Sequence, residues 1–344
     1  LSIINPKLVS NIDFSAGGFS AAYGDKLSSA LDITYKKPLL TAASLTLSFL
    51  GAEVHTEGTA INNKLSYLIG ARYKNNKYIL GGMETKGTYQ PNFTDVQGLL
   101  SYNISPRLEV SAFGYYSRNS YMMIPETRET DFGNIQMSHR LTVYFDGRES
   151  SNYDIGLGAF TLNYSPNEDL NLKLIASAYS AMESENYDIQ GQYWIGLLET
   201  NPGSEQNGNV ISNQGVGTYI EHARNDFYSQ VFNIDHKGAY KNDLFTLKWG
   251  ARYQRQYFDD FVNEWEMVDS AGFSLPHPAD SIGSPNPPHP LFEIQHLSKG
   301  HNVLNINNID GFVHNEWTFN TKNADILTLS LGIRANYWGY NNEV

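Results

Sequence analysis

The stretch GGFSAAYGDKLSSALDIT, residues 17–34, determines how the whole chain is interpreted. Two short alternating segments, 12–14 and 30–34, flank a glycine-rich turn that carries an aromatic and a charged side chain. This pattern is typical of a compact β-hairpin. The turn contains three glycines, which allow positive φ or a close approach of two backbones: Gly17, Gly18 and Gly24. We therefore expect the hairpin to lie wedged against another part of the protein.

The run NPKLVSNID at residues 5–13, followed by GGFSAAYG and LSSALDITYK, resembles the last part of the plug of Bacteroidetes-type TonB-dependent outer-membrane receptors. In that family the plug is a small domain folded inside a β-barrel pore, and this hairpin is its final element before the barrel wall. The resemblance implies that residues 1–38 end a plug and that residues 39–344 form the first half of a barrel. The residues that carry the plug motif are Gly17, Gly18, Tyr23, Gly24 and Asp32.

Composition bounds the class of protein. The mean hydropathy of −0.40 is too polar for a helical membrane protein, and no run approaches the roughly 18 apolar residues that a spanning helix requires. A membrane β-barrel places apolar residues at every second position, so its average hydropathy resembles that of a soluble protein. The net charge of −12 disfavours nucleic-acid binding. The absence of cysteine argues against a disulfide scaffold or a structural zinc site.

No signal peptide is visible, and Leu1 falls inside a predicted domain. We therefore expect most of the plug, and the segment that would engage the TonB complex, to lie upstream of residue 1.

Period-two alternation of apolar and polar residues predicts about eleven strands in an all-β, antiparallel fold. They cover 45–49, 52–56, 65–74, 96–104, 108–116, 153–164, 170–178, 218–240, 245–254, 309–319 and 327–337. On the clearest strands the charged residues share one face and Leu, Trp and Tyr share the other, as in a transmembrane barrel. A soluble sandwich shows the same alternation, so this pattern alone does not decide.

The connections alternate in length, which favours an outer-membrane barrel over a sandwich. Short turns are expected at 105–107, 165–169, 241–243 and 320–325, and long loops near 75–92, 118–152, 187–217 and 259–304. Aromatic residues near strand ends fit interfacial girdles; they are Tyr73, Tyr102, Tyr116, Tyr164, Tyr240, Trp317, Phe319, Tyr337 and Trp338.

Barrels of the resembled family have 22 strands, and eleven is half of that number. An open half-barrel in lipid would leave two edges of unpaired backbone groups, each costing several kcal/mol. We therefore expect about eleven further strands to follow Val344 or to come from a second piece of the same protein.

Two of the expected loops carry side chains that could bind a ligand. Loop 259–304 carries His277, His289, His296 and His301 among acidic residues and prolines. It could capture a metal or metal chelate, but no regular histidine spacing supports a metal site, and a proline-stiffened loop with solvated histidines is preferred. Loop 118–152 carries Tyr121, Met122, Met123 and Arg128, which could grip an anionic or aromatic ligand or a partner protein. It could equally be a lid packed on itself.

The inward-facing charges Arg72, Arg252, Glu316 and Arg334 either face the plug or line a solvated lumen. No nucleophile elbow, phosphate-binding loop or other catalytic constellation is present, so we expect no enzyme and no cofactor.

The resemblance implies an energised importer in the outer membrane of a Gram-negative bacterium, driven through TonB. The hairpin at residues 17–34 differs from the YGARAANGVILITTK run usual in glycan importers of this family. This difference favours a metal chelate such as a siderophore as the imported ligand. A second hypothesis is a receptor-like barrel that serves as a structural subunit of an outer-membrane assembly with lipoprotein partners. A third is a soluble secreted β-protein with enzymatic activity, which extraction without detergent would support.

Overall fold

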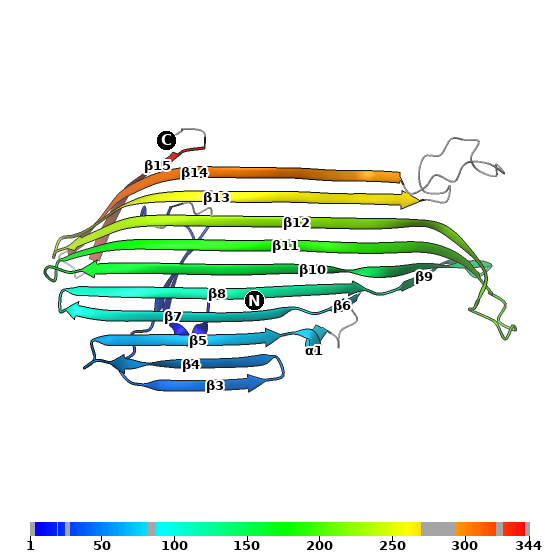
Figure 1. The fold of residues 1–344 in the computed structure, drawn as a ribbon, viewed down its shortest axis with the longest axis horizontal. Helices are drawn as coiled ribbons and strands as arrows, with labels where there is room; N and C mark the ends of the chain where they lie inside the picture. The colour runs from blue at the N-terminus through cyan, green and yellow to red at the C-terminus, as the bar shows by residue number, and fades with distance from the viewer. Residues whose placement is uncertain are drawn as a thin grey trace.

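The computed structural model describes residues 4–18, 20–24, 28–80, 87–269, 293–320 and 326–340, and the structural statements below concern these residues. They form one large and one small antiparallel β-sheet (Figure 1). Helical structure is confined in them to a 3-10 turn, η1 (Pro6–Leu8), and one turn of helix, α1 (Lys77–Leu80). None of the helices described is long and apolar enough to cross a membrane.

The large sheet has thirteen strands, and all but two follow one another along the sheet in chain order. The eleven strands of this path are β3 (Ala42–Ser48), β4 (Gly51–Ala60), β5 (Leu65–Asn75), β7 (Asn92–Ser105), β8 (Leu108–Pro125), β10 (Met137–Tyr164), β11 (Leu170–Leu198), β12 (Val210–Lys241), β13 (Phe245–Asp269), β14 (Glu293–Asn320) and β15 (Ile326–Trp338). The short strands β6 (Gly87–Tyr89) and β9 (Arg128–Asn134) pair with β8 and β10. The prediction of an all-β antiparallel fold with about eleven strands is confirmed.

The large sheet is curved and open in the part of the chain described. Strands β3 and β15 lie at its two ends and do not pair with each other. The small sheet consists of β1 (Val9–Ser15) and β2 (Ala30–Tyr35). It lies behind the large sheet in the view of Figure 1, and its Tyr35 contacts Gln97 and the ring of Phe113 on that sheet. We call the described part of residues 4–35 the N-terminal segment, and the face toward it the inward face.

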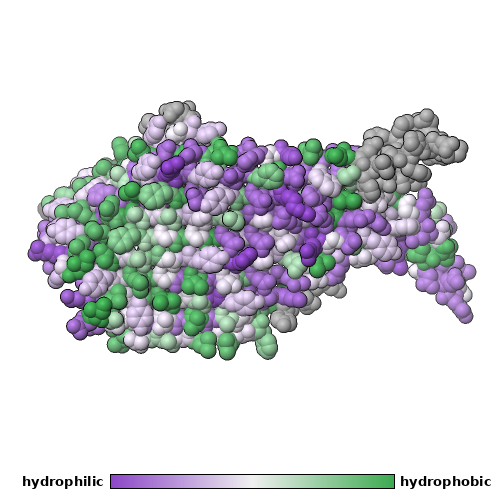
Figure 2. All heavy atoms as spheres, viewed as in Figure 1, coloured by the Kyte–Doolittle hydropathy of each residue, from purple (hydrophilic) through white to green (hydrophobic). Residues whose placement is uncertain are grey.

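The outward face carries an apolar belt at the end of the strands where the short turns lie. Its segments are 65–73, 96–104, 108–116, 156–164, 170–178, 232–240, 245–253, 309–317 and 327–335, counted by their first and every second residue. None of these outward residues is Asp, Glu, Lys or Arg. Figure 2 shows the apolar side chains gathered over this half of the visible face and hydrophilic ones over the other.

The belt is exposed and has the height of a membrane core. Ile333 is 76% exposed, Val313 53% and Phe160 51%. About nine residues per strand span roughly 30 Å along the strand, which matches the 9–11 residues of a tilted transmembrane strand. The belt therefore has the pattern and dimensions expected of a membrane-facing surface.

Two of the four regions expected to be long loops, 118–152 and 187–217, are mainly strand, and the described parts of a third, 259–304, are strand as well, so the expectation was wrong for these residues. The region 118–152 is filled by the ends of β8 and β10 together with β9, and β11 and β12 leave only residues 199–209 between them. In the region 259–304, strand β13 continues to Asp269 and β14 begins at Glu293, and residues 270–292 lie outside the described residues. The fourth expected loop, near 75–92, contains α1 and β6.

These strands were mistaken for loops because the alternation of apolar and polar residues ends where the belt ends. Beyond it both faces are polar or mixed, so the period-two signal of a half-buried strand is lost. Backbone hydrogen bonding between neighbouring strands does not depend on that signal, and pairing continues without it. Strands of 25 to 32 residues result, from β10 to β14. We call their parts beyond the belt the strand extensions.

Candidate functional site

Two groups of polar contacts fasten the N-terminal segment to the inward face, and the first is centred on Arg72 of β5. Its guanidinium forms a bidentate pair with the carboxylate of Asp95 on β7, with Nε–Oδ1 and Nη2–Oδ2 distances of 2.9 and 2.6 Å. The side chains are 3% and 0% exposed. The third side of the guanidinium donates to the backbone carbonyl of Ile4 at 3.0 Å. One buried ion pair therefore links two strands of the wall to the N-terminal segment.

Neighbouring residues complete this first anchor. Gln97 donates to Asp95 at 2.8 Å and accepts a hydrogen bond from the Tyr35 hydroxyl of the N-terminal segment at 3.3 Å. Leu8 of η1 is 1% exposed. It lies against Gly70, where an added Cβ would come within 3.1 Å of a Leu8 methyl carbon. Glycine at this position therefore allows the N-terminal segment to approach the wall closely.

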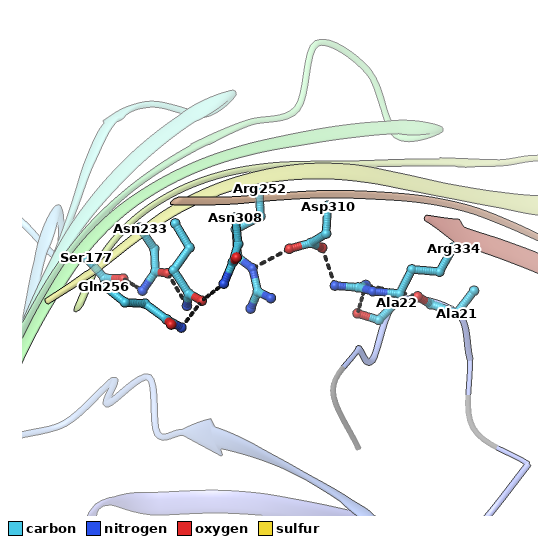
Figure 3. Close-up of polar contacts among 10 residues, drawn as sticks. Ala21, Ala22, Ser177, Asn233, Arg252, Gln256, Asn308, Asp310 and Arg334 are labelled. Carbon is cyan, nitrogen blue, oxygen red and sulfur yellow. Dashed lines mark hydrogen bonds and ion pairs between the residues drawn. The ribbon is translucent and has the colours of Figure 1, made fainter. Parts of the chain in front are cut away.

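The second anchor also lies on the inward face, near the β15 end of the sheet, and is centred on Asp310 of β14 (Figure 3). Its carboxylate accepts from Arg252 Nε of β13 at 2.6 Å and pairs with Arg334 of β15. Arg334 also donates to the backbone carbonyl of Ala21 at 3.2 Å. The Asp310 side chain is 3% exposed, so two arginines share one buried counter-charge and one of them holds the N-terminal segment.

The glycine-rich turn fits against this second anchor. Gly17 and Gly18 have φ values of +85° and +60°, a region that disfavours other residues. Any Cβ at Gly24 would collide with the guanidinium of Arg334. The Tyr23 hydroxyl donates to Asp32 at 2.8 Å and so joins the turn to β2. Among these residues, Gly24 therefore leaves room for the Arg334 guanidinium, and the Tyr23–Asp32 hydrogen bond supports the turn.

The inward wall between the anchors carries few charges and includes a row of polar side chains. Amide side chains form a chain of hydrogen bonds across the strands (Figure 3), from Asn308 to Gln254 to Asn233 to Ser177, at donor–acceptor distances of 3.5, 2.8 and 3.3 Å. Such a wall provides a polar lumen, as the lumen of a transmembrane barrel requires.

Above the belt, the inward face of the strand extensions becomes acidic. Six glutamates project from four neighbouring strands: Glu149, Glu183, Glu185, Glu221, Glu264 and Glu266. Asn225 donates to Glu264 at 2.6 Å and to Glu185 at 3.2 Å. Burial raises the pKa of the Tyr187 hydroxyl, and Glu264 and Glu185 raise it further. The inward face of the extensions therefore has a negative potential.

Glu221 of β12 lies directly opposite Glu266 of β13. Burial raises the pKa of the Glu221 carboxyl above its ordinary value of 4.5, and the Glu266 carboxylate raises it further. The contribution of Glu221 to the stability of the fold is therefore fully present below the ordinary pKa, and it is lost as the pH rises through the raised pKa.

Replacing Glu221 by glutamine is therefore expected to stabilise the protein at pH 7 by about 0.5 kcal/mol and not at a pH of about 4. The urea midpoint of unfolding at the two pH values measures this. Glu168→Gln, in the exposed turn between β10 and β11, should change neither midpoint. An equal gain at both pH values would show that the ionised, buried carboxylate of Glu221 is not the cause.

The residues expected to form a ligand or partner loop lie on strands and are dispersed. Tyr121 and Met123 of β8 pair with Ser151 and the inward-facing Glu149, so both face inward, whereas Met122 faces outward. Arg128 of β9 lies over the ring of Phe145 at 5.5 Å.

His296 of β14 pairs with Glu266, and four strands separate β14 from β8 on the sheet. His277 and His289 lie outside the described residues. In the described part of the chain, no three His, Cys, Asp or Glu side chains are arranged to hold a metal ion.

Sequence reasoning placed Arg72 and Arg334 on the inward face, and both contact the N-terminal segment. Arg252 and Glu316 lie on the same face, but Glu316 contacts His314 and Lys248 of the wall. The reasoning missed the partner carboxylates Asp95 and Asp310. Their alternation signalled an inward position, but pairing them with an arginine requires the strand register.

No family model matches this chain, and no curated protein matches it. Among solved structures it is similar to the alcaligin outer-membrane receptor FauA from Bordetella pertussis, with 10% identity over 96% of this chain and 68% of that one and a TM-score of 0.28. The ferripyoverdine receptor of the outer membrane of Pseudomonas aeruginosa gives 7% identity, 96% and 60% coverage and a TM-score of 0.28. The siderophore receptor PirA from Pseudomonas aeruginosa is 11% identical over 97% of this chain and 80% of that one, with a TM-score of 0.25. At these scores none of them supports an assignment.

Proposed function

We propose that this chain is part of a TonB-dependent outer-membrane receptor, of the Bacteroidetes type, that imports a scarce ligand through a plugged β-barrel. The observation that carries the proposal is the placement of the N-terminal segment. It is held by two buried arginine–carboxylate anchors on the inward face of a sheet whose outward face bears an apolar belt. Residues 1–38 are then the end of the plug, and residues 39–344 are part of the barrel wall.

The belt supports a membrane location by its composition. Its outward residues include no formal charge on nine strands, although the chain as a whole carries 24 Lys and Arg and 36 Asp and Glu. In hydrocarbon each lipid-facing charge would cost roughly 2–4 kcal/mol near the midplane, which explains their exclusion. The open edges of β3 and β15 cannot face lipid unpaired. We propose that about eleven further strands of the complete protein pair with these two edges and close the barrel.

The anchors support a plug that is held firmly and can still be moved. Polar and ionic contacts fix geometry, but water and polar lumen groups can replace them as the plug shifts, which a continuous apolar interface would not allow. The outer membrane has no ATP, so the work of moving the plug must be transmitted across the periplasm by the TonB complex. A ligand bound at the strand extensions would be released into the channel by that movement.

The favoured ligand class is a metal chelate such as a siderophore. The acidic inward face of the extensions adds a condition on its charge, because a surface of one sign attracts ions of the opposite sign and repels those of its own. A chelate that is neutral or cationic at pH 7 fits this face better than a polyanionic one.

The test is uptake of radioactive iron as ferrioxamine B, a cationic chelate, and as ferric citrate, an anionic one, in cells with and without the gene. The proposal expects gene-dependent uptake of the cationic chelate that disappears in a strain without TonB. Protein found in the outer membrane with stable protein partners and no gene-dependent uptake of either probe would favour a structural subunit instead. Recovery in the soluble fraction without detergent would contradict the membrane location itself.

A further inference from the structure

A groove on the outward face lies at the upper limit of the belt, across β10, β11, β12 and β13. It has a volume of about 770 Å³ and is lined by Gly156, Ala178, Ser180, Phe232, Arg255 and Tyr257, among others. The strand register confirms its side of the sheet, because Ala178 pairs with Phe232 and Phe232 with Arg255, in line with outward residues of the belt. The volume lies within the range of sites for small molecules.

The groove is lined by the rings of Phe232 and Tyr257 and is open above Gly156. A Cβ added at Gly156 would meet no atom within 4 Å. The Phe232 side chain is 43% exposed. A shallow groove beside aromatic rings fits a flexible hydrocarbon chain.

One end of the groove carries a positive charge without a carboxylate partner. Within the described residues Arg255 forms no ion pair, and its Nε donates a hydrogen bond to Asn305 Oδ1 at 3.4 Å. Arg118 lies beyond the belt on β8, two residues after Tyr116, and forms an ion pair with Asp154 at 3.7 Å. Arg255 therefore offers a guanidinium to an anion, whereas Arg118 is already neutralised.

We propose that this groove binds a phosphorylated, acylated lipid of the membrane leaflet that borders the strand extensions. The phosphate would be held by Arg255, whose planar fork suits phosphate oxygens. An acyl chain would lie over Gly156 and Ala178, beside the rings of Phe232 and Tyr257. The groove opens outward, so the lipid enters sideways from the leaflet, and a soluble phosphate compound would leave the apolar part empty. This proposal rests on the membrane location inferred above.

The chain supplies a matched set of variants for the test. Arg255→Gln removes the charge, and Gly156→Leu fills the groove at a position where the added side chain meets no neighbour within 4 Å of Cβ. Arg118→Gln and Gly114→Leu are the controls. Gly114 also has open space around it and faces outward in the belt, but it does not line the groove. Each variant is made in the complete polypeptide that contains this chain.

The experiment has two stages, which separate this proposal from the proposed function. Fractionation first shows whether each variant reaches the outer membrane. Native mass spectrometry in detergent then measures the retention of added diphosphoryl lipid A and of its dephosphorylated form. We expect wild type to retain the phosphorylated lipid, Arg255→Gln to bind it roughly tenfold more weakly, Gly156→Leu to bind both forms more weakly, and the two controls to match wild type.

The proposal is overturned if Arg255→Gln and Gly156→Leu reach the membrane and retain diphosphoryl lipid A as wild type does. It is also overturned if Arg118→Gln lowers retention as much as Arg255→Gln, because binding would then follow net charge and not the groove. Absence of wild-type protein from the membrane fraction would instead remove the proposed function.

Discussion

Replacing Asp95 by asparagine is expected to destabilise the protein by roughly 3–5 kcal/mol, because it leaves a buried guanidinium without its counter-charge. Arg72 and Asp95 are 3% and 0% exposed, so water cannot replace the lost carboxylate. The same guanidinium donates to Ile4, and its repositioning would also weaken the hold on the N-terminal segment. Urea unfolding of the purified protein in lipid vesicles, followed by tryptophan fluorescence, measures the loss.

Two further variants show whether burial is the cause. Asp131→Asn breaks a pair with Arg140 whose members are 49% and 26% exposed, and its unfolding midpoint should stay close to that of wild type. The double variant Arg72→Met with Asp95→Leu removes both charges and should regain most of the stability lost in Asp95→Asn. An unchanged midpoint in Asp95→Asn would contradict the role of this ion pair.

Replacing Asp310 by asparagine is expected to loosen the glycine-rich turn from the wall. Arg252 and Arg334 would then face each other without the carboxylate between them. Arg334 would move away from its partner and from the carbonyl of Ala21. Because the chain has no cysteine, a single Ala22→Cys reports directly on this movement. Its labelling by a water-soluble maleimide should accelerate about tenfold or more.

Glu316→Gln is the control for Asp310→Asn. Glu316 lies on the same strand and the same face, but it pairs with His314 and Lys248 of the wall. Labelling at Ala22→Cys should keep its wild-type rate in this background. Equal acceleration by both substitutions would mean that the wall as a whole has loosened, and no acceleration by either would mean that Asp310 does not hold the turn.

The sequence predicted the part of each strand that lies within the apolar belt. Within the belt one face must be apolar and the other polar, so segments such as 245–254 alternate clearly and were recognised as strands. Beyond Tyr253 the same strand continues to Asp269 with polar and aromatic residues on both faces. That half has no period, because neither of its faces has to be uniformly apolar.

The candidate site was predicted only in part, for a similar reason. Alternation placed Arg72 and Arg334 inward, but choosing Asp95 and Asp310 as their partners needs the register between strands, which a single strand does not contain. The run Tyr121, Met122 and Met123 seemed one surface only when interpreted as a loop. As part of β8 it splits between the two faces, because successive side chains of a strand point in opposite directions.

The most direct test of the central claim, that the outward belt faces lipid, is the accessibility of spin labels on β14 of the complete protein in outer-membrane vesicles. Single cysteines replace Val313 in the belt and Val303 in the strand extension, two outward positions on one strand. The account predicts that the label at residue 313 collides with oxygen and not with a water-soluble nickel chelate, and that the label at residue 303 does the reverse. Equal access of the nickel chelate to both positions would contradict it.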